Sequence, residues 1–291
     1  MHKYIKAIGF QTVSSEKQWN QILRHGEDNF TGYELISLEE GLDFCELKKE
    51  YGIDIGICSY GQIDENERFE REYYVPYFIG SGITSHADVT VEKRSDRESY
   101  VGICEDAKVG VTLIFHLING MEIRKEMERG DISRYSASIT LSGLANEGTV
   151  LLPILKNQEQ EERRREESRN RMMLLSAARE GDSEAIENLT LDDIDIYTQV
   201  TKRLEHEDIF SIVDTYFMPC GVECDHYSVL GEILDIDILE NSLTGEEVYV
   251  LTLDVNELTF DVCVPVKSLT GEPEIGRRFK GDIWLQGQIN F

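Results

Sequence analysis

The chain has 291 residues, of which 41% are hydrophobic and 9% aromatic, and this composition excludes an intrinsically disordered protein. Its 29 basic and 56 acidic residues give a net charge of −27, and residues 172–291 hold 25 of the acidic but only 7 of the basic side chains. This charge opposes non-specific binding to nucleic acid or to an anionic membrane, because both are polyanions.

The first elements predicted are short and end at glycine or polar turns. Met1–Phe10 fits either a short strand or one helical turn, and Ser14–Glu16 can cap a helix that has Trp19 on its apolar side. A second helix is predicted over Leu38–Tyr51, because Gly52 follows it as a termination signal. The residues expected to face inward from that helix are Leu42, Cys45 and Leu47.

A β-hairpin is predicted next, from Ile53–Ile63 and Phe69–Phe78, with a polar turn between them. Pro76 restricts its second strand to a sheet edge or a bulge, because proline donates no backbone hydrogen bond. The apolar run Val109–Ile118 fits a central strand or a buried helix, since periodicity alone does not distinguish them.

Met121–Arg129 is predicted to be a helix, and Ala137–Leu155 to be a second hairpin around Asn146–Gly148. The strands of this half occur as hairpins and not as regular βαβ units. Residues 1–156 are therefore predicted to form an α+β domain with mainly antiparallel strands.

A highly charged helix is predicted to follow at Gln158–Asn170, which has no apolar position before Met172. We expect this helix to be exposed and to connect the two halves of the chain, so that proteolysis at Arg163–Arg165 releases two compact fragments. An apolar cluster follows it, and the segment 157–221 is predicted to be a block of helices.

Residues 222–291 alternate between apolar and polar positions and contain glycines inside the last strand, Arg278–Phe291. Four or five strands of this kind predict a small antiparallel β-barrel of the size of an OB fold. The fold class predicted for the chain is therefore α+β, with an antiparallel-sheet domain (1–156), a helical middle block (157–221) and a small C-terminal barrel (222–291).

Targeting features point to a soluble cytoplasmic protein. The longest apolar run is about half the ~20 residues that a membrane-spanning helix needs, and the N-terminus lacks the pattern of a secretory signal. The six cysteines are sparse and contain no CxxC pair, which favours a reducing compartment.

Cys220, Cys224 and His226 form a C-x3-C-x-H pattern whose thiolates and imidazole would suit zinc. No second pair of ligands lies nearby in the sequence. The alternative is two ordinary thiols at a junction between a helix and a strand, and we favour this alternative.

Arg277, Arg278 and Lys280 lie where a strand begins, after a loop that resembles a phosphate-binding loop only in its two glycines. These side chains could contact an anion or a partner. The favoured alternative is a solvated strand entry that balances acidic neighbours.

His86 and Asp88, next to a glycine-rich loop, are the best candidates for acid–base chemistry, but no nucleophile motif accompanies them. Tyr73 and Tyr77 belong to an aromatic patch around Pro76. Alternation along a strand would divide this patch between the core and a binding surface.

Several segments resemble a family of bacterial proteins of unknown function that occurs mainly in anaerobic Gram-positive bacteria of the clostridial group. The resemblance covers essentially the whole chain and implies a soluble cytoplasmic bacterial protein, without implying an activity, a cofactor or a catalytic residue. Among the segments that carry it are SYVGICEDAKVGVTLIF (99–115), DTYFMPCGVECDHYSVLGEIL (214–234) and IGRRFKGDIWLQGQINF (275–291).

The favoured function is a non-catalytic binding or scaffold protein, with an unidentified protein as its partner. An enzyme with its site near His86, Asp88 and the Tyr73–Tyr77 patch is the first alternative. Nucleic-acid binding through the barrel is the second, and the charge of residues 172–291 disfavours it. No cofactor, nucleic acid or membrane is expected as a partner, and the oligomeric state stays open.

Overall fold

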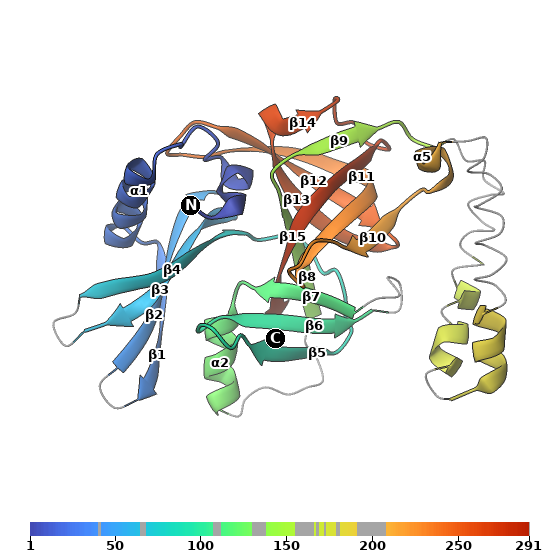
Figure 1. Cartoon of the computed structure of the whole chain (residues 1–291), viewed down its shortest axis with the longest axis horizontal. Coiled ribbons are helices and arrows are strands. Elements are labelled where there is room, and N and C mark those ends of the chain that lie inside the picture. The colour runs from blue at the N-terminus through green and yellow to red at the C-terminus, as the bar shows by residue number, and fades with distance from the viewer. Residues whose placement is uncertain are drawn as a thin grey trace.

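The computed structural model contains two β-sheets and few helices, so the fold is α+β (Figure 1). No helix among the described residues is long and apolar enough to cross a membrane. The structure describes residues 1–39, 42–64, 68–106, 112–129, 138–154, 166, 169–171, 173–178, 181–190 and 208–290.

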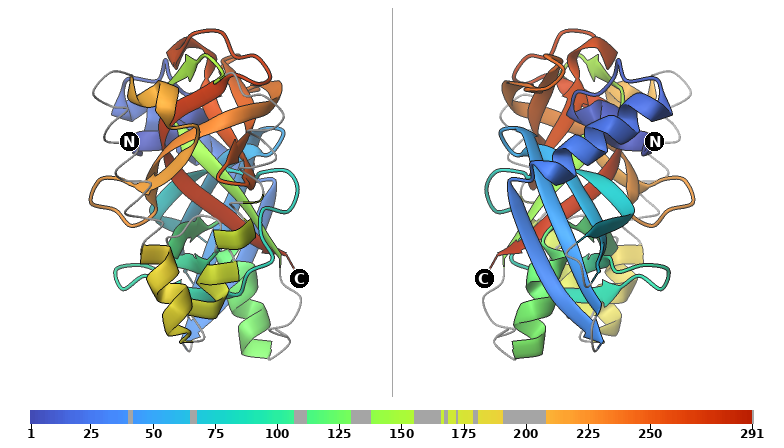
Figure 2. Two further views of the ribbon diagram at one scale, coloured as in Figure 1. Left: turned by 90° about the vertical axis from the view of Figure 1, so that its right-hand side faces the viewer. Right: turned by 90° about the vertical axis from the view of Figure 1, so that its left-hand side faces the viewer.

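The smaller sheet has four antiparallel strands in the order β1-β2-β3-β4. The helix α1 (Glu16–Asp28) lies across this sheet (Figure 2), and its first turn is capped by Ser15, whose side chain accepts a hydrogen bond from the Gln18 amide. Trp19 and Leu23 of α1 are buried against the sheet side, which confirms Trp19 as part of the apolar side of this helix. The strands are β1 (Gly32–Glu39), β2 (Leu42–Gly52), β3 (Ile55–Ile63) and β4 (Phe69–Phe78).

The prediction of a helix over Leu38–Tyr51 is wrong, because most of this segment forms β2, the second strand of a hairpin with β1. Cys45 points to one side of β2 and Phe44 and Glu46 to the other, and all three are buried. Because both faces are covered, the strand shows no alternation of apolar and polar residues.

The hairpin of β3 and β4 is confirmed, and β4, which contains Pro76, is an edge strand. The ambiguous apolar run contains a strand, β7 (Thr112–Leu117), and the predicted helix is α2 (Gly120–Arg129). Met1–Phe10 contains the 3-10 helix η1 (Lys3–Ile8).

The larger sheet has eleven strands, and its main path is β10-β11-β12-β13-β8-β15-β7-β6-β5. Strands β8 and β9 form where the second hairpin is predicted, but each pairs with β15 and not with the other. Its other elements are β5 (Val89–Lys93), β6 (Tyr100–Glu105), β8 (Ser138–Ala145), β9 (Gly148–Leu151), β10 (Tyr216–Pro219), β11 (His226–Glu240), β12 (Glu247–Val255), β13 (Leu258–Pro265), η2 (Val266–Ser268), β14 (Leu269–Thr270) and β15 (Arg278–Asn290).

Strand pairing links the segments 1–156 and 222–291, which the sequence assigns to different domains. β15 pairs with β7, β8 and β9 of the first segment and with β11 of the second. Five strands are paired in the order β11, β12, β13, β8 and β15, and β15 pairs again with β11. Among these pairings, β13–β8 is parallel. One strand of this set, β8, therefore precedes the segment predicted to form the barrel.

Two hydrophobic cores also combine both segments. One lies between α1, η1 and the four-stranded sheet and includes Trp284 of β15. The other belongs to the larger sheet, where Gly287 allows the Phe115 ring to pack closely, since a Cβ there would lie 2.7 Å from the ring.

The central segment is only partly described. Glu166, Arg169 and Asn170 of the charged helix are helical and exposed, while the rest of the prediction for Gln158–Asn170 lies outside the described residues. After it, residues 183–190 are helical and Ala185 is buried, but α5 (Ile209–Ile212) is short and leads into β10.

Candidate functional site

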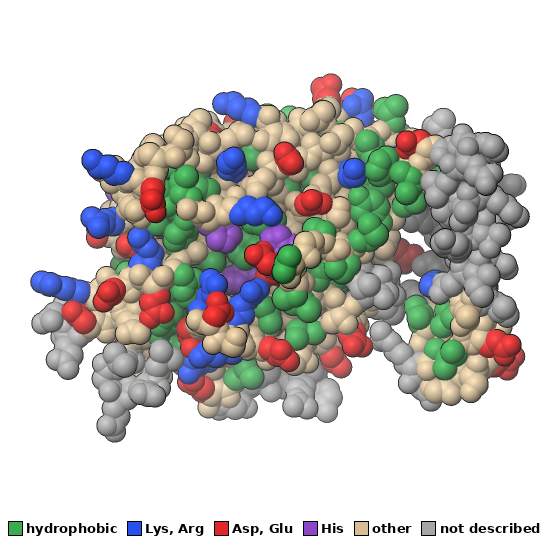
Figure 3. Space-filling model, in the orientation of Figure 1, with side chains coloured by type: hydrophobic (Ala, Val, Ile, Leu, Met, Phe, Trp, Pro, Cys, Tyr) green, Lys and Arg blue, Asp and Glu red, His purple; other side chains and the backbone are tan. Residues whose placement is uncertain are grey.

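A cavity of about 290 Å³ opens where the two sheets meet η1. Its walls come from η1, β4, the turn after β5, β7, the loop before β11, and β15. Figure 3 shows histidine side chains visible in the middle of the face drawn there, with lysine and arginine side chains around them. The cavity therefore brings together residues that are far apart in the sequence.

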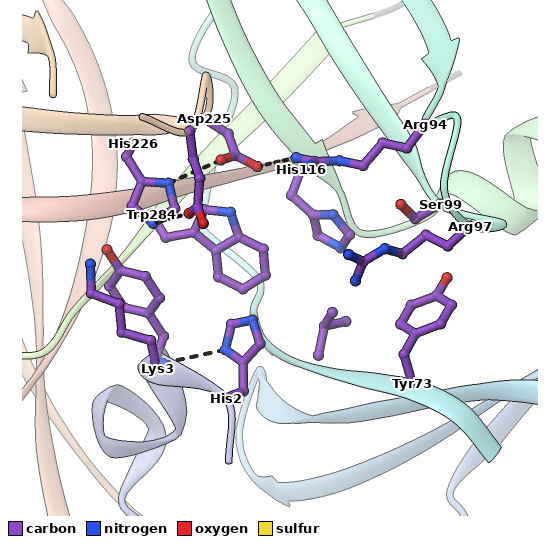
Figure 4. Close-up of a pocket in the computed structure, with 13 residues that line it drawn as sticks. His2, Lys3, Tyr73, Arg94, Arg97, Ser99, His116, Asp225, His226 and Trp284 are labelled. Carbon is purple, nitrogen blue, oxygen red and sulfur yellow. Dashed lines mark hydrogen bonds and ion pairs between the residues drawn. The ribbon is translucent and has the colours of Figure 1, made fainter. Parts of the chain in front are cut away.

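Trp284 forms the apolar wall of the cavity and is 5% exposed. Three rings surround it: His2 at 4.9 Å between ring centroids, His116 at 5.1 Å and Tyr4 at 5.8 Å. In Figure 4, His2, His116 and Arg97 point toward a common space beside Trp284, and the Tyr73 ring lies on its far side. The Trp284 ring is thus largely covered by aromatic neighbours, and the space beside it is bordered by groups that can donate hydrogen bonds.

The N-terminal wall is held in place by hydrogen bonds that fix η1. The His2 Nδ1 atom accepts a hydrogen bond from the Tyr4 amide (3.3 Å), and the His2 amide donates to the Tyr74 hydroxyl (2.7 Å). At the other end, the buried Asn241 side chain donates to the Ile8 carbonyl (2.8 Å). Lys3 and Tyr4 are thereby fixed at the cavity.

Asp225 and His226 form the opposite wall, immediately before and at the start of β11. The His226 Nδ1 atom lies 3.0 Å from the Asp225 Oδ1 atom, and Arg94 forms an ion pair with the same carboxylate. Burial would raise the pKa of Asp225, but hydrogen bonds from His226 and Trp284 and the charge of Arg94 lower it to about 2. Asp225 is therefore a carboxylate throughout the physiological pH range.

The imidazoles of His2 and His116 are neutral at neutral pH. Burial lowers the pKa of His2 to about 4 and that of His116 to about 3, and the positive charge of Arg97 contributes to both shifts. The Nε2 atom of His116 is buried and has no hydrogen-bond partner among the described residues. Each neutral ring carries one N–H and one lone pair, so it can donate or accept.

The positive charges at the cavity come from Lys3, Arg94 and Arg97. The Arg97 side chain is 43% exposed, lies 5.3 Å from the centroid of the Tyr73 ring and pairs with Asp96 at the surface. The Lys3 ammonium lies 5.1 Å from the centroid of the Tyr4 ring. Part of this positive charge faces solvent and is accessible to an entering ligand.

Of the predicted catalytic and aromatic candidates, only Tyr73 lies at this cavity. Its hydroxyl donates to the Glu98 carbonyl (2.5 Å), which leaves the ring as its contribution to the wall. Tyr77 is buried in the core, 5.1 Å from the Lys48 ammonium. His86 and Asp88 are exposed and line neither of the two cavities described.

The three basic candidates of the last strand do not form one surface. Arg278 is 5% exposed, and its guanidinium donates to the carbonyls of Leu152, Phe210, Val213 and Asp214. Arg277 pairs with Glu274 (2.7 Å). Lys280 lies over the Phe210 ring and at the edge of a second, polar cavity of about 400 Å³.

The predicted metal pattern is only partly reproduced in space. Among the described residues, the group that converges is Glu223, Asp225 and His226, with one ligand atom of each within 4.8 Å of the others. Cys220 and Cys224 do not belong to this group and are free thiols. The converging group shares His226 with the sequence pattern, but its other members are carboxylates: Glu223 lies between the two cysteines in the sequence, and Asp225 lies between Cys224 and His226.

Sequence reasoning missed most of this site. His2, the Arg94–Arg97 turn and Trp284 lie in three separate segments with no motif in common, and no spacing rule connects them. The only local signal was the pair of carboxylates next to His226. The pairing of β15 with β11 and β7 brings His226 and His116 to Trp284 from distant parts of the chain.

Comparison with known proteins yields one family. A family model described as "Domain of unknown function, E. rectale Gene description (DUF3881)" matches residues 5–287, and E. rectale is a clostridial gut bacterium. No curated protein and no solved structure matches the chain.

Proposed function

Because the chain belongs to the DUF3881 family of domains of unknown function, we propose its function from the geometry of the cavity. We propose that it is a non-catalytic binding protein and that the cavity beside Trp284 binds a small anionic molecule with a flat or apolar part. The evidence is the convergence of positive charge and hydrogen-bond donors around an aromatic surface.

This proposal rests on the charge of the cavity, which differs from the charge of the whole chain. The whole chain has a net charge of −27, whereas the cavity gathers Lys3, Arg94 and Arg97 against Glu223 and Asp225. Asp225 is already neutralised by its ion pair with Arg94. With three positive and two negative side chains in its lining, the cavity repels anions less than the rest of the acidic surface does, and its hydrogen-bond donors can orient an anion.

The size of the cavity limits the ligand. Ligand pockets commonly occupy about 300–1,000 Å³, so a cavity of about 290 Å³ suits a small metabolite and not a polymer. The aromatic residues around Trp284 offer apolar contact for a planar group, and the arginines offer N–H donors for a carboxylate or phosphate.

The direct test is a binding titration of the full chain with defined anions: inorganic phosphate, a sugar phosphate, benzoate and an indole carboxylate. We expect at least one organic anion to bind saturably and its neutral amide or alcohol analogue to bind more weakly. Arg97→Gln should weaken binding about tenfold or more, because it removes a charge-assisted hydrogen bond.

Arg24→Gln is the matched control, since Arg24 is exposed on α1, outside the residues that line the cavity, and its loss changes the net charge equally. The proposal is contradicted if none of these anions binds, or if both arginine variants weaken binding to the same extent.

An enzyme is the second candidate, because a histidine paired with a buried aspartate lies in the wall of a concave site with several polar groups. In this reading His226 would act as the acid or base, in place of His86. Mass spectrometry of each bound anion after prolonged incubation would decide: a product absent with His226→Gln supports the enzyme, and an unchanged anion supports the binding protein.

A further inference from the structure

The Glu223 carboxylate and the His226 imidazole face each other without a hydrogen bond. The His226 Nε2 atom lies 3.0 Å from the Glu223 Oε2 atom, a contact that is an ion pair only if the ring is protonated, and Nε2 has no hydrogen-bond partner among the described residues. His226 is 8% exposed, whereas the side chain of Glu223 is 69% exposed. A buried ring nitrogen therefore points at an accessible carboxylate.

The other side of the imidazole determines what the Nε2 atom carries. The Nδ1 atom lies 3.0 Å from the Asp225 carboxylate, which can only accept, so Nδ1 carries the proton. In the neutral ring, the Nε2 atom then carries a lone pair and no proton. Two lone-pair atoms at 3.0 Å repel each other unless a positive charge lies between them.

We propose that Glu223 and His226 bind a divalent transition-metal ion of the zinc class, and that Asp225 orients the His226 ring for this role. An ion pair between a protonated His226 ring and Glu223 is the competing explanation, and it predicts no saturable zinc binding in the titration below. The inference does not depend on the proposed anion binding.

The geometry agrees with metal chemistry. Two ligand atoms on a tetrahedral zinc ion, each about 2.0–2.1 Å from the metal, lie about 3.3 Å apart, close to the separation found here. A histidine that binds a metal through one nitrogen commonly donates the other N–H to a carboxylate, as His226 does to Asp225. Arg94 compensates the charge of Asp225, which leaves Glu223 as the anionic ligand.

The loop that carries these residues is fixed by the backbone. The Cys220 amide donates to the His226 carbonyl (2.9 Å) and the Leu285 amide to the Asp225 carbonyl (2.9 Å). Because Glu223 is exposed, an ion reaches the site from solvent without opening the core. With two protein ligands, the remaining coordination positions are open to water or to an anion, and the affinity should be below that of closed four-ligand zinc sites.

The test is calorimetric titration of the metal-free full chain with Zn²⁺ alone, together with the absorption spectrum of the Co²⁺ form. We expect one saturable site, and a cobalt spectrum without a thiolate charge-transfer band. Glu223→Gln and His226→Gln should each weaken zinc binding about tenfold or more, and Asp225→Asn about 10- to 100-fold through the lost orientation of the ring. Cys220→Ser and Cys224→Ser should bind zinc as the unchanged chain does.

Glu223→Gln is the decisive variant, because an exposed side chain can be replaced without loss of folding, which a circular dichroism melt of each variant verifies. The proposal is overturned if the unchanged chain shows no saturable zinc binding, if Glu223→Gln binds zinc with unchanged affinity, or if the cysteine variants abolish binding.

Discussion

His116 is a buried histidine in the wall of the cavity, and its burial keeps the imidazole ring uncharged. Burial lowers its pKa from 6.5 to about 3, so the folded protein holds a neutral ring where the unfolded chain holds one that protonates below pH 6.5. Its contribution to stability is therefore complete above pH 6.5 and is lost as the pH falls toward 3.

His116→Gln should consequently reduce the acid sensitivity of the protein. Between pH 6.5 and about 4.5 the unchanged chain should lose up to about 1.4 kcal/mol of unfolding free energy per pH unit through this residue, and the variant should lose that much less. Urea denaturation at several pH values measures the slope. Equal slopes for both proteins would show that His116 is already protonated or is not buried.

Arg278 is buried and binds backbone carbonyls, although the sequence favours a solvated strand entry at this position. Its N–H groups all point to backbone carbonyls on the two sides of residues 155–207. Arg278→Met should destabilise the protein by about 3 kcal/mol or more, because buried carbonyls lose charged partners. Arg277→Met, one residue away and near the surface, should change stability by less than about 1 kcal/mol, as thermal denaturation of both variants can show.

At the scale of elements, the sequence predicts those whose own signals decide their structure. Ser15 marks the start of α1, Pro76 marks an edge strand, and the strands after His226 follow from clean alternation. β2 is different, because both of its faces are covered and its sequence therefore lacks the alternation of apolar and polar residues. Its residue types are also compatible with a helix. Pairing between β15 and strands far away in the sequence has no local signal at all.

The charged segment still provides a test at this scale. Trypsin should cut first at Arg163–Arg165, since we expect a highly charged connection to be accessible. Because β15 pairs with β7, β8 and β9, the two products should remain together on gel filtration in native buffer and separate only in denaturant. Separation in native buffer would show that the two segments fold independently, as the sequence alone suggests.

At the scale of the whole molecule, acidity and a local basic cavity have different consequences. The net charge of −27 repels a polyanion, which must lie along much of the protein surface. A small anion inside the cavity contacts only the charged side chains that line it. Single-stranded DNA or RNA should therefore bind no more tightly than weakly micromolar at physiological salt. Fluorescence anisotropy with a labelled oligonucleotide checks this, and nanomolar, salt-sensitive binding would contradict it.

The binding claim depends most directly on Trp284, which is one of two tryptophans in the chain. In a Trp19→Phe background it becomes the only tryptophan reporter, and its emission can be followed while organic anions such as benzoate, an indole carboxylate and a sugar phosphate are added. The account predicts a saturable change for at least one organic anion, strongly weakened by Arg97→Gln and preserved in Arg24→Gln. No saturable change for any of them, in a variant that remains folded, would contradict it.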